Sequence, residues 1–101
     1  MNETIPNTSS LSLNVNVPIQ LDAVCGTQGD FVPRWFRFED DEHVIQTIKI
    51  SRIISRKEIG YVGMKSLQFI CGSMDYGERE RLFELRYNIP GHKWTLYQML
   101  S

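Results

Sequence analysis

Apolar and polar residues alternate along the N-terminal quarter of the chain. Over residues 11–25 every second residue is apolar, which is the period of a β-strand with one buried face. Pro18 lies at one of the positions that alternate with the apolar residues, and it has no amide hydrogen. We therefore expect this strand at a sheet edge or bent near Pro18. Residues 1–10 are polar and turn-forming. They predict a flexible tail ahead of a single β domain over residues 11–101.

Alternation, or a dense run of aromatic and β-branched residues, marks five further strands. The segment 44–56 fits helical spacing as well as alternation, but its β-branched side chains lose rotamer freedom in a helix, so a long, bent strand is expected. Turn-forming residues separate the strands, among them the acidic residues 39–42, which predict a hairpin tip. The five strands are expected at residues 31–38, 44–56, 67–71, 83–89 and 94–100.

The segment 58–64 has two glycines, Gly60 and Gly63, on either side of Tyr61 and Val62. Glycine adopts backbone conformations closed to other residues, so we expect a loop here. An exposed apolar tip would leave a hydrophobic patch, which favours a loop tucked as a plug over the end of the sheet. The alternative is a mobile contact loop.

Together these elements predict a single all-β domain of about six antiparallel strands, a meander rolled into a curved sheet or partly open barrel. The alternation also assigns the buried face. The expected core consists of Val17, Ile19, Leu21, Phe36, Phe38, Ile48, Ile50, Phe69, Cys71, Phe83, Leu85, Tyr87, Trp94 and Leu96.

Composition fits an ordinary globular domain, with 42% hydrophobic and 23% charged residues and a net charge of −1. The first basic residue is Arg34, so a secretory signal is not expected, and no apolar run approaches the roughly 20 residues that span a bilayer. We therefore expect a cytoplasmic protein without a membrane partner. Cys25 and Cys71 have apolar neighbours and are expected as reduced core thiols.

The sequence has no phosphate-binding loop, dinucleotide fingerprint, nucleophile elbow or zinc-protease motif. His43 and His92 lie at expected turns without a second ligand at metal-site spacing, and residues 40–43 lack the spacing of a calcium loop. We expect a protein that is not an enzyme, with no catalytic residue, cofactor or metal.

Basic and aromatic residues are interleaved in one part of the chain, the composition of a surface that holds single-stranded nucleic acid by stacking and phosphate contacts. The plainer interpretation assigns the aromatics to the core and the charges to solvent faces, and alternation supports it, because Phe36 and Phe38 share one face while Trp35 and Arg37 share the other. The candidate interaction surface consists of Arg34, Trp35, Arg37, Arg52, Arg56, Lys57 and Tyr61.

An open sheet leaves edges that must be paired, covered or charged. Residues 11–17 alternate without a charged side chain to protect such an edge. Our first functional hypothesis is therefore a non-enzymatic module that forms a homodimer or binds a protein partner through an edge strand. Nucleic-acid binding is the alternative, and the net charge does not favour it.

Several short motifs carry a family resemblance: residues 18–25, the Gly29–Asp30 turn, residues 33–39 and residues 93–97. Together they resemble a group of small uncharacterised β-rich proteins of Firmicutes, over about residues 15–100. This chain differs from that pattern in the order of Gly29 and Asp30 and in having Phe38 at a position where Trp is common. The resemblance implies a bacterial cytosolic β module and transfers no functional residue.

Overall fold

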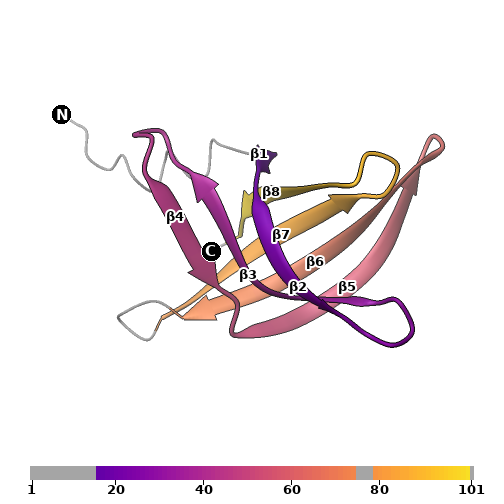
Figure 1. The fold of residues 1–101 in the computed structure, drawn as a ribbon, viewed down its shortest axis with the longest axis horizontal. Helices are drawn as coiled ribbons and strands as arrows, with labels where there is room; N and C mark the ends of the chain where they lie inside the picture. Colours follow the sequence, from indigo (N-terminus) through magenta and orange to yellow (C-terminus); the bar gives the residue numbers. More distant parts are fainter. Residues whose placement is uncertain (1–15, 75–78, 101) are drawn as a thin grey trace.

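The computed structural model describes residues 16–74 and 79–100, apart from the side chain of Tyr61. They form two antiparallel sheets, one of five strands in the order β1-β8-β7-β6-β5 and one of three in the order β2-β3-β4. The small sheet crosses in front of the large one at a steep angle (Figure 1). The all-β expectation is confirmed. The strands are β1 (Val17–Pro18), β2 (Gln20–Cys25), β3 (Phe31–Glu39), β4 (Ile45–Lys49), β5 (Arg52–Tyr61), β6 (Met64–Met74), β7 (Glu80–Asn88) and β8 (Lys93–Met99).

The strand count differs from the six expected, because two of the expected strands pass from one sheet to the other. The first of these is interrupted at Ile19, directly after Pro18, where a bend was expected. Before the interruption β1 pairs with β8, and after it β2 pairs with β3. The expected strand over residues 44–56 is interrupted at Ile50 and Ser51, so that β4 pairs with β3 and β5 with β6. The two sheets are joined at these corners but do not close into a barrel.

The loop expected over residues 58–64 is wrong. Strand β5 continues to Tyr61, and a two-residue turn of Val62 and Gly63 leads directly into β6. Both turn residues have positive φ, 48° and 78°, as a tight hairpin with the right-handed strand twist requires. Val62 is 84% exposed, so it does not form part of a plug.

The core lies between the two sheets and mixes residues of both. Phe36 of the small sheet packs edge-on against Phe83 of the large sheet, with 5.6 Å between ring centroids. Every residue of the predicted core except Tyr87 is buried or packs against the buried cluster. Tyr87 contacts the ring of Trp94, which is one of the partly buried residues packed against the cluster. The buried apolar residues of the described chain are Phe36, Phe38, Phe69, Cys71, Phe83, Leu85 and Leu96.

The two cysteines differ from each other. Cys71 is buried, and this burial raises its pKa to about 12, so its thiol stays protonated. Cys25 is exposed, which corrects its assignment to the core: it is the last residue of β2, where the chain leaves the sheet for the turn at residues 26–30.

The expected tail, residues 1–10, and the start of the first expected strand, residues 11–15, lie outside the described residues. Within residues 16–74 and 79–100 there is no helix that could cross a bilayer.

Candidate functional site

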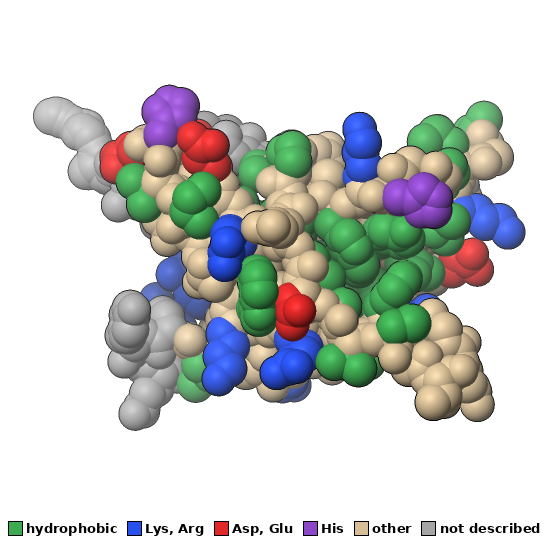
Figure 2. Space-filling view, in the orientation of Figure 1, with side chains coloured by type: hydrophobic (Ala, Val, Ile, Leu, Met, Phe, Trp, Pro, Cys, Tyr) green, Lys and Arg blue, Asp and Glu red, His purple; other side chains and the backbone are tan. Residues whose placement is uncertain are grey.

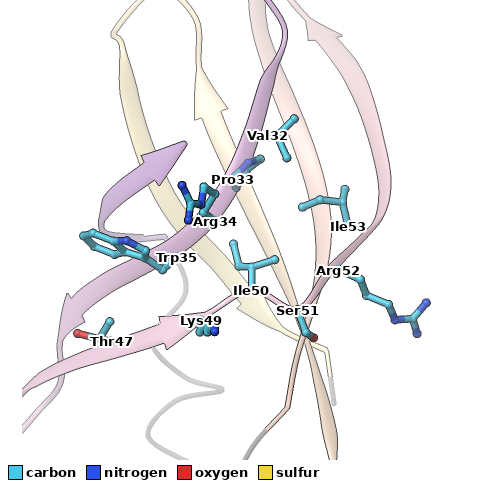
Figure 3. A pocket seen from close by; sticks show the side chains of 10 residues that line it. All are labelled: Val32, Pro33, Arg34, Trp35, Thr47, Lys49, Ile50, Ser51, Arg52 and Ile53. Atoms are coloured by element: carbon cyan, nitrogen blue, oxygen red, sulfur yellow. The ribbon is translucent and has the colours of Figure 1, made fainter. Parts of the chain in front are cut away.

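A hollow of about 560 Å³ lies where β4 ends and β5 begins. Figure 3 shows it between β3 and this corner, with the side chains of Val32, Ile50 and Ile53 directed into it. We call it the β3–β5 hollow. Its lining consists of Val32, Pro33, Arg34, Trp35, Thr47, Lys49, Ile50, Ser51, Arg52 and Ile53.

The hollow exists because β4 is short. Asp22 pairs with Trp35 and Ala23 with Pro33, which makes Arg34 the extra residue of a β-bulge. The amide of Ile50 donates to the carbonyl of Arg34 at 2.9 Å, and then the chain turns away into β5. Within the described part of the chain, residues 31–33 of β3 consequently pair with β2 on one side only. A gap remains between this part of β3 and the start of β5.

The floor of the hollow is apolar. Pro33 is buried, and Ile50 and Ile53 pack against the core cluster. Val32 remains 45% exposed at the side of the hollow. An apolar side chain bound here would therefore be removed from water, which is favourable, and it would not displace any ionised group.

The rim of the hollow is cationic. Arg34 and Lys49 form no ion pair with any described residue. Arg52 donates from Nε and one terminal nitrogen to both carboxylate oxygens of Glu80, at 2.6 and 2.7 Å. This bond raises the pKa of Arg52 and lowers that of Glu80. Among the described residues that line the hollow there is no carboxylate, so these residues give it a positive field.

Trp35 lies at one end of the hollow on the outer face of the small sheet. It is half-buried and lies opposite Lys49 in the β3–β4 register. The guanidinium of Arg37, two residues further along the same face, lies 5.0 Å from the indole centroid. One ring face is therefore already engaged in a cation–π contact.

The structure separates the residues of the predicted interaction surface. It brings Arg34, Trp35 and Arg52 together in the hollow and places Arg37 beside them. Two other residues lie further along β5. They are Arg56, which lies over the ring of Phe69 at 5.8 Å, and Lys57, which points to the opposite face of the strand. The side chain of Tyr61 is outside the described structure.

Sequence reasoning missed the contribution of β4. Lys49 and Thr47 lie opposite Trp35 and Arg37 in the register, so they share the outer face of the small sheet. Their alternation with Ile48 and Ile50 was a signal for that face. Ser51 was not identifiable, because only the passage of the chain between the sheets brings it to the hollow.

No group of three His, Cys, Asp or Glu side chains suited to a metal ion occurs in the described residues. Comparisons with protein-family models, curated proteins and solved structures give no match to this chain. Its function is therefore inferred from the chemistry of the hollow.

Proposed function

We propose that this protein is a non-enzymatic interaction module that binds an extended acidic peptide segment of a partner protein in the β3–β5 hollow. One observation carries the proposal: an apolar floor meets cations, Arg34 and Lys49, that form no ion pair with any described residue, in one hollow. A ligand that matches both has an apolar side chain flanked by carboxylates. Ile50 and Ile53 would contact the apolar group, and Arg34 and Lys49 would pair with the carboxylates.

The strands around the hollow support an extended ligand. Within the described residues β5 pairs only with β6, and residues 31–33 of β3 pair only with β2. A peptide that enters the gap can therefore add backbone hydrogen bonds to its side-chain contacts. Further along β5, Arg56, Lys57 and the bulge at Ile54 discourage indiscriminate strand pairing. On β5, strand pairing with a peptide is thereby confined to the end that lies at the hollow.

The proposal includes a bacterial cytoplasmic setting. Cys25 and Cys71 are both free thiols, as expected in a reducing compartment. The resemblance to small β-rich proteins of Firmicutes supports the bacterial part.

The test uses a fluorescein-labelled peptide of about ten residues with a central Ile flanked by Asp and Glu. Fluorescence anisotropy should show binding to the full chain and none for the same peptide with Lys in place of its acidic residues. The double variant Arg34→Glu/Lys49→Glu should weaken binding at least about tenfold, because two attractive contacts become repulsive. Lys57→Glu reverses a single cation outside the hollow and is the control, which should bind like the parent. Equal weakening by Lys57→Glu would contradict a specific role of the hollow.

Single-stranded nucleic acid is the second candidate, because Trp35 lies beside Arg34 and Lys49. Two features favour the peptide. Arg37 already covers one face of the Trp35 ring, so that face is not open to a stacking base. Arg56 and Lys57 lie on opposite faces of β5, so they do not form one phosphate-binding surface. The same assay with an oligothymidylate of about 12 nucleotides separates the two. Tighter binding of the oligonucleotide, with a log–log salt slope of about 0.7 per phosphate, would establish nucleic-acid binding instead.

A further inference from the structure

We infer that the peptide-like ligand of the β3–β5 hollow is the acidic β3–β4 turn of a second copy, so that the protein assembles head to tail. This inference rests on the proposed function and names its partner. We define the acidic tip as residues 39–45, which end β3, form the turn and begin β4.

The acidic tip combines carboxylates with exposed apolar side chains. It contains four consecutive acidic residues, at positions 39–42. Val44 and Ile45 directly follow the turn and are 49% and 56% exposed. Exposed branched side chains next to carboxylates are the composition that the hollow favours.

Internal hydrogen bonds hold the tip in one shape. One carboxylate oxygen of Asp40 accepts from the amides of Glu42 and Val44, each at 2.9 Å, and the Glu39 carboxylate bonds to His43 at 2.7 Å. Asp40 and Glu39 therefore shape the turn. Glu42 contributes only its amide to these bonds, so its carboxylate is available to an external cation.

The two surfaces are complementary and lie at opposite ends of one hairpin. Arg34 and Lys49 would pair with the tip carboxylates, and Val44 or Ile45 would contact the apolar floor. Figure 2 shows acidic and hydrophobic side chains together at the β3–β4 turn, and several Lys and Arg side chains, with an acidic side chain beside them, towards the other end of this hairpin.

A chain cannot fill its own hollow with its own tip. The pair Trp35–Lys49 marks the hollow end of the hairpin, and the pair Glu39–Ile45 marks the tip. Four residues of extended strand separate them by about 13 Å, and paired strands do not fold back on themselves. The contact must therefore form between copies. Since it joins two different surfaces, we expect it to continue into a chain or a ring. A two-fold dimer would instead require two copies to fill each other's hollows at the same time.

The experiment uses two full-length variants that each lose one surface. The tip variant is Glu42→Lys/Ile45→Ser, and the hollow variant is Arg34→Glu/Lys49→Glu. In sedimentation velocity up to about 500 µM, the parent should grow beyond a dimer as concentration rises. Each variant alone should remain a monomer. An equimolar mixture should form dimers and stop there, because one intact tip meets one intact hollow.

Dimers in the mixture also establish that both variants are folded. Lys57→Glu reverses a cation outside both surfaces and is the control, which should assemble like the parent. A parent that stays monomeric or stops at a dimer, a mixture that stays monomeric, or a symmetric dimer that survives in both variants would each overturn head-to-tail assembly. The last result would point instead to the edge at residues 11–17. If the labelled acidic peptide still binds the hollow in these cases, the proposed function stands with a different partner.

Discussion

Val62 is strained by its backbone conformation. It has φ of 48° in the turn between β5 and β6 and is followed by Gly63 at 78°. A β-branched side chain is disfavoured at positive φ, whereas Asn tolerates it, and Asn-Gly is the preferred pair for this turn. Val62→Asn should therefore raise the free energy of unfolding by about 1 kcal/mol.

Urea denaturation measures this change. Val24→Asn is the matched control, because Val24 is also exposed but lies in β2 without positive φ. It should give no gain. An equal gain from both variants would show that surface polarity, not the turn, is responsible.

Glu84 is a carboxylate that is only 3% exposed although it lies on the outer face of the large sheet. It accepts hydrogen bonds from Gln68, Arg86 and Gln98 at 2.7 to 2.9 Å. Burial acts to raise the pKa of Glu84, but these bonds and the Arg86 charge lower it overall. The ionised form therefore stabilises the fold at neutral pH, and this contribution is lost as the pH falls through the lowered pKa.

Glu84→Gln should lower the free energy of unfolding at pH 7 by roughly 2 kcal/mol, the scale of hydrogen bonds to a charged group. As the pH falls below the ordinary pKa of Glu and through the lowered pKa of Glu84, the difference from the parent should shrink, because Glu84 becomes protonated in the parent as well. Urea titrations at neutral and acidic pH measure both values. The pKa values of Asp40 and Glu80 are also lowered. Because both residues are present in the parent and in the variant, their effect on the pH dependence cancels in the difference between the two proteins. A difference that does not change with pH would contradict the role of Glu84 ionisation.

At the scale of elements, a contact across three strands controls one cation of the hollow. Glu80 of β7 reaches across Gly72 of β6 to Arg52 of β5. Gly72 permits this because a Cβ atom there would collide with the Glu80 carboxylate. Glu80→Gln should release the Arg52 guanidinium and increase the affinity for the labelled acidic peptide about two- to fivefold. Glu58→Gln on β5 is the control in the same anisotropy assay, and an equal increase would indicate a general charge effect.

The elements also show how far the sequence predicts the fold and the site. Alternation assigned Phe36 and Phe38 to one face of β3 and Trp35 and Arg37 to the other, because each strand buries a single face. It did not reveal the break at Ile50 and Ser51, since the β-branched pattern continues through it and only pairing with different neighbours separates β4 from β5.

The remaining differences have similar causes. Two glycines suggested a loop over residues 58–64, but only Gly63 occupies a turn position and Gly60 lies within β5. The predicted interaction surface grouped the basic residues by their proximity along the chain. In a strand successive side chains point to opposite faces, so Arg56 and Lys57 lie on different faces of β5. The hollow depends on where β4 ends relative to β3, which is a tertiary property that no local pattern contains.

At the scale of the whole molecule, the two sheets share one core and are joined at Ile19 and at Ile50–Ser51. Phe36 would lose its contact with Phe83 if the small sheet opened alone, which would expose the face of the large sheet. Separation of the sheets therefore costs burial on both sides, and we expect the described β domain to unfold in a single cooperative transition.

Each sheet has its own fluorescent reporter, Trp35 in β3 and Trp94 in β8. Trp94→Phe leaves the small-sheet reporter, and Trp35→Phe leaves the large-sheet reporter. In urea, the fluorescence midpoint of each variant should coincide with its own midpoint by circular dichroism, because both probes follow the same two-state equilibrium. A Trp35 signal that changes at lower urea than the circular dichroism of the same variant would contradict this. It would show that the small sheet, and with it the β3–β5 hollow, opens independently of the large sheet.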